Sequence, residues 1–147
     1  MAMAERRAQI SWQGDLRGGS GQLEVASGAF PAQTMTFAAR SEGADGKTSP
    51  EELIAAAHAT CYAMAFSNTL KTDGGAAPDR LDVSAVCALD RVDGGLKITT
   101  MDLTVRGTVA GMDDARFKEL ARTAEQRCPV SNALRNNVEI RVDAALM

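Results

Sequence analysis

Three cysteines and one histidine are the residues of this 147-residue chain whose side chains could do nucleophilic or metal chemistry. Cys61 and Cys128 stand 67 residues apart, and Cys87 lies between them. An odd number of cysteines without a closely spaced pair does not form a disulfide scaffold or a zinc site, and one histidine excludes most histidine-based metal centres. The sequence therefore predicts thiol chemistry that requires no metal, flavin or haem.

Cys128 stands directly before Pro129, and the residue before a proline is forced out of the helical conformation. We expect Cys128 to be the N-cap of the following turn, where free backbone N–H groups and the helix dipole favour a thiolate. Arg127 is its neighbour in the sequence. These local effects favour Cys128 as the more acidic thiol, and the alternative is a cysteine that serves only as a cap.

Cys61 lies about three turns inside a predicted helix, beyond the useful range of the helix dipole. Cys61 taken alone is either a small apolar residue that fills the core or a nucleophile. As a nucleophile, it needs a group other than the helix dipole to stabilise its thiolate. His58 lies one turn before it on the same face, but two residues of one helix share a proton poorly, which favours a solvated or core-satisfied histidine. Cys87 is in phase with the inward face of a strand, which favours a core residue.

The strongest local signal is the helix start Ser49-Pro50-Glu51-Glu52. Ser49 is the expected N-cap, Pro50 the first helical residue, and Glu52 closes a capping box. Glu51 is thereby left without a local structural role. The helix is expected to run to about Lys71, before the helix-breaking residues Gly74, Gly75 and Pro78.

Alternating apolar residues predict strands on both sides of this helix. Three strands precede it, the third running from Met35 to Arg40. Two strands follow it, joined by a turn at Asp93-Gly94-Gly95. A helix from about Asp113 to Arg127, a short turn of helix to Leu134 and a last strand come after them. The order β-β-β-α-β-β-α-β predicts an α+β fold, and the length predicts a single domain over residues 1–147.

The first long helix is apolar or small nearly all round between Ile54 and Phe66, which is typical of a helix that is buried on every side. One antiparallel sheet covers only one face of it. A second copy of the chain is the simplest cover for the other face, with small alanines allowing a close approach. The sequence therefore predicts a homodimer.

Charge and composition exclude several classes of partner. The net charge is −3 and there are six aromatic residues, so neither a basic stripe nor a base-stacking platform is present. The longest mostly apolar run falls short of the ~20 residues that a membrane span needs, and the N-terminus lacks the pattern of a signal peptide. We expect a cytoplasmic protein that binds neither nucleic acid nor membrane, and in which any disulfide is transient.

Two segments together resemble the osmotically inducible protein C / organic hydroperoxide resistance family. One is Arg40-Ser41-Glu42-Gly43 followed by Ser49-Pro50-Glu51-Glu52-Leu53-Ile54-Ala55-Ala56-Ala57-His58-Ala59-Thr60-Cys61, and the other is Cys128-Pro129-Val130-Ser131-x-Ala133-Leu134. The segment Met35-Thr36-Phe37-Ala38-Ala39-Arg40 is similar to the osmotically inducible branch. The resemblance covers essentially the whole chain, and the two cysteine motifs are specific.

The resemblance implies an intertwined homodimer with its central helices buried between sheets, and a peroxidase that prefers organic hydroperoxides to hydrogen peroxide. It implies that Cys61 is the peroxidatic cysteine and Cys128 the resolving one, and that Arg40 and Glu51 activate the thiol. In the organic hydroperoxide resistance branch, the activating arginine comes from the first hairpin. Arg17 occupies that position in this chain. The implied reductant is a cellular dithiol, such as a lipoyl-bearing protein.

Glu51 precedes Cys61 by ten residues, about 15 Å along a straight helix. One arginine hardly bridges that distance within one chain, so we expect the activating pair and the cysteine to come from different protomers. Two other functions remain open from the residues: a non-catalytic stress or ligand-binding dimer, and a general dithiol–disulfide exchange protein. The apolar residues Leu53, Ala57, Met64 and Phe66 suit an organic peroxide or a plain core.

Overall fold

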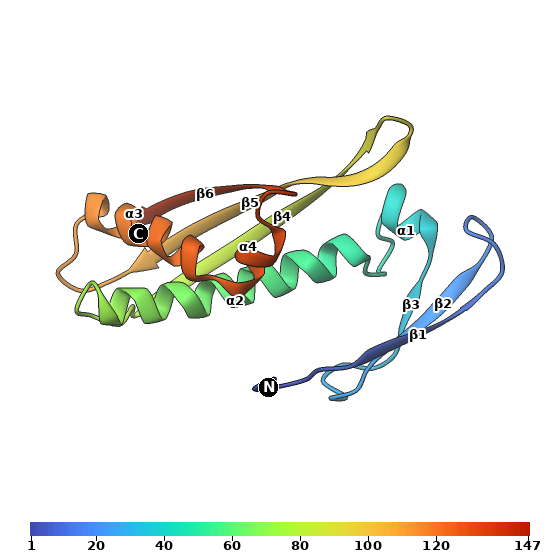
Figure 1. The fold of residues 1–147 in the computed structure, drawn as a ribbon, viewed down its shortest axis with the longest axis horizontal. Coiled ribbons are helices and arrows are strands. Elements are labelled where there is room, and N and C mark those ends of the chain that lie inside the picture. Colours follow the sequence, from blue (N-terminus) through green and yellow to red (C-terminus); the bar gives the residue numbers. More distant parts are fainter. The chain divides into compact units, whose positions relative to one another are not determined.

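The computed structural model describes residues 1–147, which form two compact units, Met1–Pro50 and Glu51–Met147. The first unit is a three-stranded antiparallel sheet in the order β1-β2-β3 (Figure 1). Its strands are β1 (Ala8–Gln13), β2 (Ser20–Val25) and β3 (Gln33–Met35), and a short helix, α1 (Phe37–Ser41), follows them. The prediction of a single domain over residues 1–147 stays a prediction.

Helix α1 corrects the sequence prediction, which extended the third strand to Arg40. The strand ends at Met35, and the side chain of Thr36 caps a helix by accepting a hydrogen bond from the backbone N–H of Ala39 at 3.1 Å. Two alanines follow Phe37 in this helix, and alanine has the highest helix propensity of all residues. The cap and these alanines favour a helix more strongly than the short alternation of apolar residues favours a strand. Arg40 therefore lies in the last turn of a helix instead of at the end of a strand.

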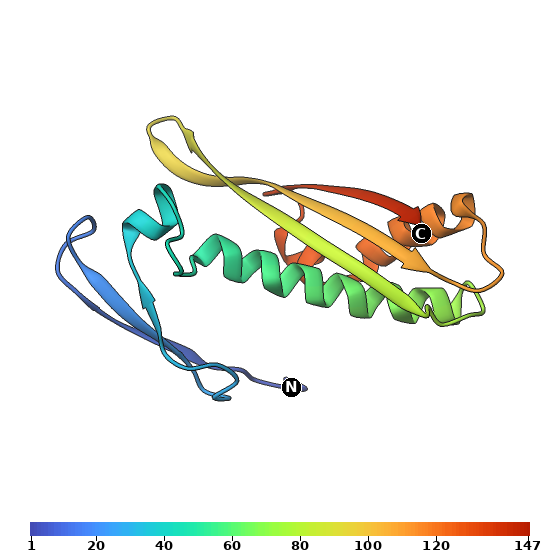
Figure 2. The ribbon, with the colours of Figure 1, turned by 180° about the vertical axis from the view of Figure 1, so that it is seen from behind.

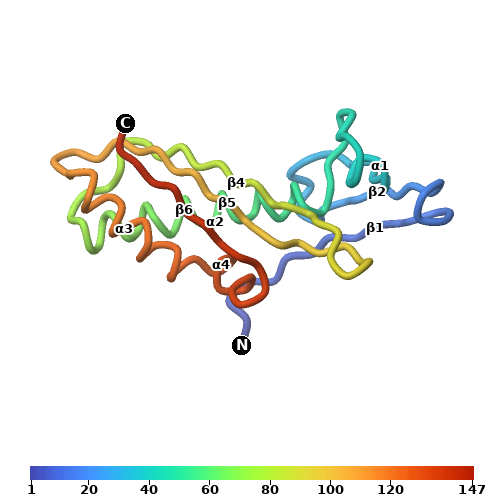
Figure 3. The backbone as a smooth tube through the Cα atoms, turned by 90° about the horizontal axis from the view of Figure 1, so that it is seen from above, coloured from blue at the N-terminus to red at the C-terminus, as the bar shows by residue number.

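The second unit is a three-stranded sheet with helices on one face. It contains α2 (Pro50–Thr72), β4 (Arg80–Val92), β5 (Gly95–Thr108), α3 (Asp114–Arg127), α4 (Pro129–Leu134) and β6 (Glu139–Leu146). Helices α2 and α3 lie on the same side of the sheet (Figures 1 and 2), and Figure 3 shows β5 in the middle of the order β4-β5-β6. The predicted α+β fold is confirmed, with α1 as an additional short helix and α4 at the place of the predicted short helical turn.

Turn chemistry and helix crossover explain how the strands of this sheet pair. Asp93 and Gly94 both have positive φ angles, 52° and 80°, so they form the tight two-residue turn that joins β4 and β5 as an antiparallel hairpin. Strand β6 returns after α3 and α4 and pairs with β5 in parallel. A parallel pair needs such a crossover connection, which the sequence pattern alone did not indicate.

Helix α2 begins at Pro50 and ends at Thr72, as the cap and the glycines predicted. Its buried side chains follow helical spacing along one face, at His58, Tyr62, Phe66 and Leu70. The opposite face is open to solvent in the chain, and Met64 on it is 69% exposed. No helix of the structure has the length and apolar character needed to cross a membrane.

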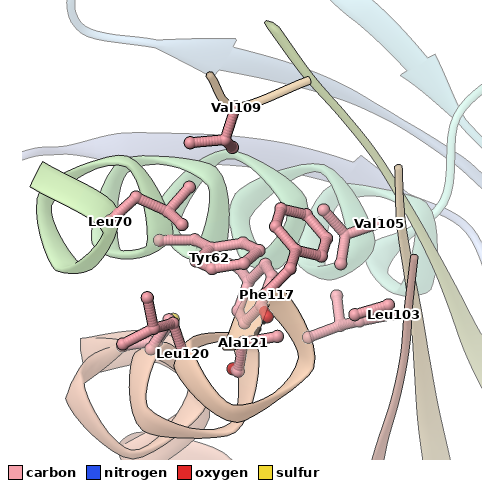
Figure 4. Packing of buried hydrophobic residues seen from close by; sticks show 12 residues of the cluster. Tyr62, Leu70, Leu103, Val105, Val109, Phe117, Leu120 and Ala121 are labelled. Atoms are coloured by element: carbon pink, nitrogen blue, oxygen red, sulfur yellow. Dashed lines mark hydrogen bonds between the residues drawn. The ribbon is translucent and has the colours of Figure 1, made fainter. Parts of the chain in front are cut away.

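The core of the second unit lies between α2, α3 and the inner face of β5. Phe66 and Phe117 are both fully buried, and their ring centroids are 4.9 Å apart. Leu103 and Val105 of β5 complete this layer, and the hydroxyl of Tyr62 donates a hydrogen bond to the carbonyl oxygen of Ala121 at 2.9 Å (Figure 4). Phe66 is therefore a core residue of the second unit.

The close approach of β5 to α3 gives a test of this packing. A Cβ atom on Gly107 would lie 2.7 Å from Cζ of the fully buried Phe117 ring and 2.8 Å from Cδ2 of Leu81. We expect Gly107→Ala to destabilise the protein by about 1–3 kcal/mol in denaturant unfolding, because the filled core must shift. Gly95→Ala at the start of the same strand is the control, since its nearest contact would be 3.8 Å away. Equal unfolding free energies for the two variants would contradict this packing.

Candidate active site

The fold brings Cys61 and Cys128 together. Cys61 lies on the third turn of α2 and is half-buried, whereas Cys128 lies between α3 and α4 and is fully buried. The Cys128 thiol is within hydrogen-bonding reach of Cys61, and this contact contributes to raising the pKa of the Cys61 thiol. Two cysteines that are 67 residues apart in the sequence therefore form one dithiol site.

The break between α3 and α4 places Cys128. Its backbone is extended, with φ −74° and ψ 116°, and Pro129 follows at the first helical position, as predicted. Cys128 is the N-cap of α4, but its side chain makes no capping hydrogen bond. Cys128 is therefore a cap by its backbone position only, while its thiol lies near Cys61, and a chemical role for it stays a prediction.

A backbone hydrogen bond from Val130 in the first turn of α4 reaches Cys61 and lowers the pKa of its thiol. From the sequence, the backbone N–H groups of this turn are expected to stabilise a thiolate at Cys128. The structure assigns one of them to Cys61, because α4 packs with its first turn beside α2. A sulfur three turns inside one helix thus receives a hydrogen bond from the start of another.

Burial has the largest effect on the Cys61 thiol, and the pKa is raised on balance. Desolvation and the nearby Cys128 thiol both disfavour the thiolate, and they outweigh the hydrogen bond from Val130. All of these groups belong to the second unit, and none of them is a cation. The surroundings of Cys61 in that unit therefore hold the sulfur beside its partner without ionising it.

Arg127 is not directed at Cys128, although the two residues are adjacent in the sequence. Its guanidinium pairs with Asp73 just beyond the end of α2, with Nη2 2.8 Å from Oδ2. The hydrogen bond from Arg127 is the largest cause that lowers the pKa of Asp73. Arg127 therefore ties the end of α3 to the end of α2.

His58 is a buried core histidine, one of the two outcomes that the sequence favoured. It bonds across to α4, where its Nε2 lies 2.6 Å from Oγ of Ser131, and both residues are fully buried. Burial lowers the pKa of His58 more than the charge of Glu125 raises it. The Glu125 carboxylate is itself paired with Arg135 at the end of α4, with Oε1 2.8 Å from Nη1.

Glu51 and Cys87 lie toward the other end of α2. Glu51 is buried in the first turn, and its charge adds to burial in raising the pKa of the half-buried Cys87 on β4. Glu51 and Cys61 belong to one continuous helix, so ten residues separate them by about 15 Å. Glu51 therefore does not reach the Cys61 thiol of its own chain.

The two candidate arginines belong to the first unit. Arg40 is half-buried in the last turn of α1. Arg17 is exposed, and its guanidinium carbon lies 5.5 Å from the centre of the Phe37 ring, in a cation–π contact. The roles of Arg40, Arg17 and Glu51 in activating a thiol stay predictions. No group of three or more histidine, cysteine or acidic side chains is arranged to hold a metal ion.

Sequence reasoning missed three contacts of this site: the Val130 backbone bond to Cys61, the His58–Ser131 bond and the Glu125–Arg135 pair. One signal was present. His58 stands three residues before Cys61 and Ser131 three residues after Cys128, so each cysteine has a hydrogen-bonding side chain about one turn away.

Comparisons with known proteins give close relatives over nearly the whole chain. The chain is 39% identical over 141 residues to the peroxiredoxin OsmC of Escherichia coli strain K12, covering 96% of both chains. It is 33% identical over 103 residues to the organic hydroperoxide resistance protein of Xanthomonas axonopodis pv. citri, covering 70% of both.

Two solved structures share the fold. An organic hydroperoxide resistance protein OsmC of Legionella pneumophila matches with a TM-score of 0.77 and 21% identity, over 99% of both chains. OhrB of Bacillus subtilis matches with a TM-score of 0.74 and 24% identity, over 94% of this chain and 97% of that one.

A family model described as OsmC-like protein matches residues 43–143. This range includes Cys61, Cys128 and Glu51 and stops short of Arg40 and Arg17. It spans more than half of the chain, and the chain therefore belongs to the family of OsmC-like proteins.

Proposed function

We propose that this protein is a thiol peroxidase that reduces organic hydroperoxides, and hydrogen peroxide more weakly, with Cys61 as the peroxidatic and Cys128 as the resolving cysteine. The observation that carries the proposal is the contact between a half-buried thiol and a fully buried one. Relatives named for peroxide reduction and for organic hydroperoxide resistance support it. The reaction uses no cofactor.

The proposed cycle begins at Cys61, because it is the more exposed residue of the pair. Its thiolate attacks the distal oxygen of the hydroperoxide, the O–O bond breaks, and the alkoxide takes a proton and leaves as the alcohol. Cys61 is thereby oxidised to a sulfenic acid. The Cys128 sulfur then attacks the Cys61 sulfur, water leaves, and a disulfide forms.

A dithiol of the cell, such as a lipoyl group, reduces this disulfide by exchange. We propose that its thiolate attacks the sulfur of Cys61, since Cys128 is fully buried, and that Cys128 leaves as the thiolate. A second attack within the mixed disulfide releases the oxidised dithiol and restores Cys61. A reducing compartment such as the cytoplasm supplies such a reductant.

The first step needs a thiolate, and the second unit alone raises the pKa of Cys61. Lowering the pKa of a thiol from about 8.5 to about 6 requires roughly 3.4 kcal/mol in favour of the thiolate. An exposed ion pair supplies only about 0–1 kcal/mol, so the cation must be held in a water-poor site. We propose that Arg40 supplies it, oriented by Glu51, and that Arg17 is the alternative.

A homodimer provides such a site. The solvent-facing side of α2 carries Ala56, Ala57, Thr60 and Met64, which are small or apolar side chains at helical spacing. Two copies of this face packed together bury the surface that the chain leaves open. We propose that this packing also brings Cys61 of one protomer near the α2 start of its partner, because a buried carboxylate stands there at position 51.

A general dithiol–disulfide exchange protein is the second candidate. The observation that favours it is the contact between the Cys61 and Cys128 thiols, because two neighbouring thiols can also exchange with the disulfide of another molecule. A non-catalytic stress or ligand-binding dimer is the third possibility, in which neither cysteine would react with peroxide.

Cysteine variants separate these functions. We expect Cys61→Ser to abolish the stoichiometric consumption of cumene hydroperoxide, measured with a dithiol reductant, because the attacking sulfur is gone. Cys87→Ser is the matched control, being another half-buried cysteine, and should retain the wild-type rate. Peroxide consumption that persists in Cys61→Ser, or that is absent from the wild type, would refute the peroxidase function.

Cys128→Ser should complete one turnover and then stop. Its Cys61 sulfenic acid has no resolving thiol beside it, so further peroxide oxidises it to the sulfinic acid. Mass spectrometry should show a gain of two oxygen atoms on the peptide that contains Cys61. A Cys128→Ser protein that cycles at the wild-type steady-state rate would contradict a resolving role.

Mixed dimers test whether the site is shared between protomers. A Cys61→Ser chain combined with a Glu51→Ala chain retains one Cys61 and one Glu51 on opposite protomers. We expect about half of the wild-type activity, because one complete shared site remains. If the site lies within one chain, this dimer should be no more active than its parents.

The reciprocal mixed dimer is the control. It pairs a wild-type chain with a chain that carries both substitutions, so Cys61 and Glu51 remain only on the same protomer. The shared site predicts an inactive dimer here, whereas a site within one chain predicts half of the wild-type activity.

A further inference from the structure

The hydrogen bond between His58 and Ser131 joins the two elements that carry the cysteines. His58 belongs to α2 and Ser131 to α4, and the 2.6 Å bond between Nε2 and Oγ is fully buried. The two residues are 73 positions apart in the sequence, so the bond is a long-range link. It therefore constrains where α4 lies relative to α2.

The buried imidazole of His58 makes its hydrogen bond with the Ser131 hydroxyl. Burial lowers the pKa of His58, which keeps the ring neutral near pH 7, with one N–H group and one lone pair. Nδ1 has no hydrogen-bond partner. If the bond to Ser131 were broken while the ring stayed buried, neither ring nitrogen would have a partner, and this state is unfavourable. The cost of that state holds Ser131 in place.

The link lies one helical turn from the two sulfurs. His58 precedes Cys61 by three residues on α2, and Ser131 follows Cys128 by three residues and Val130 by one. The backbone bond from Val130 to Cys61 and the contact between the thiols thus belong to the same helix–helix contact as the His58–Ser131 bond. A shift of α4 that breaks one of these interactions weakens all of them.

An ion pair at the end of α4 joins this helix to a different neighbour. Arg135 at the end of α4 pairs with Glu125 of α3, at 2.8 Å, and so ties α4 to α3. The bond between His58 and Ser131, in contrast, joins α4 to α2 and so helps to place Cys128 relative to Cys61.

We propose that His58 and Ser131 are positioning residues that hold the Cys128 sulfur against Cys61 and thereby set the effective concentration of the thiol pair. The inference rests on the proposed use of these cysteines as a reversible disulfide pair. Neither residue touches the peroxide. Their role is to keep the resolving thiol in place before the sulfenic acid forms.

The effective concentration can be measured without peroxide, in buffers of reduced and oxidised glutathione. Two protein thiols and one oxidised glutathione give one protein disulfide and two reduced glutathione molecules, so the equilibrium constant has units of concentration. The ratio of oxidised to reduced protein is read by thiol alkylation and mass spectrometry, in a Cys87→Ser background that leaves only the pair.

Two substitutions at position 58 differ by one methylene group. The side-chain amide of His58→Gln reaches the place of the imidazole Nε2 and can bond Ser131, whereas that of His58→Asn ends near the place of Nδ1 and cannot. We expect His58→Asn and Ser131→Ala each to lower the effective concentration at least tenfold, which corresponds to about 30 mV in reduction potential. His58→Gln should stay within about threefold of the parent protein.

The double variant His58→Asn/Ser131→Ala should be no lower than either single variant, because each change removes the same bond. Tyr62→Phe is the control for a merely structural role. It removes another buried hydrogen bond of α2, the one from the Tyr62 hydroxyl to the Ala121 carbonyl of α3, and it leaves α4 untouched. It should lower the melting temperature while keeping the parent effective concentration.

Three results would overturn the inference: parent-like effective concentrations in both His58→Asn and Ser131→Ala, an equal fall in Tyr62→Phe, or no recovery in His58→Gln. Failure of the proposed function has a different signature. A parent protein that forms the disulfide in glutathione but does not consume cumene hydroperoxide would refute the peroxidase function. The positioning role would then still be decided by the effective concentrations of the variants.

Discussion

The contact between α2 and the first turn of α4 is the constraint on which the site depends. It sets the Cys128 thiol beside Cys61 and directs the backbone hydrogen bond of Val130 to the Cys61 sulfur. Pro129 makes this contact possible, because it ends α3 at Arg127 and lets α4 start in a new direction. The dithiol site is thus a consequence of a helix break that is packed against an unbroken helix.

Opposing effects on the Cys61 sulfur decide what else the chemistry needs. Burial raises the pKa of the thiol, the neighbouring thiol raises it further, and one backbone hydrogen bond does not compensate. The same burial gives any nearby cation a much larger effect than it would have in water. We expect a sulfur in such surroundings to need a guanidinium held beside it, which is why the proposed function combines the dithiol with Arg40, Glu51 and a second protomer.

Much of the fold was predictable because its signals are local. The start of α2 at Pro50, the start of α3 near Asp113 and the turn at Asp93-Gly94 each depend on a few adjacent residues, and each of these positions is confirmed. The prediction failed at Phe37–Ser41, where a single threonine cap outweighed an alternating pattern. The parallel pairing of β5 with β6 and the His58–Ser131 bond depend on residues far apart in the sequence, so no local pattern could indicate them. The pairing of Cys61 with Cys128 was accessible only through the family resemblance, because local electrostatics favoured the other cysteine.

The central claim is that the two sulfurs brought together by α2 and α4 are the pair that a hydroperoxide oxidises. The most direct measurement is peptide mapping by mass spectrometry after the reduced protein reacts with one equivalent of cumene hydroperoxide. We expect a single intramolecular disulfide between Cys61 and Cys128, with Cys87 still a free thiol. A disulfide that involves Cys87, or a Cys61 that stays reduced while the peroxide persists, would contradict the account.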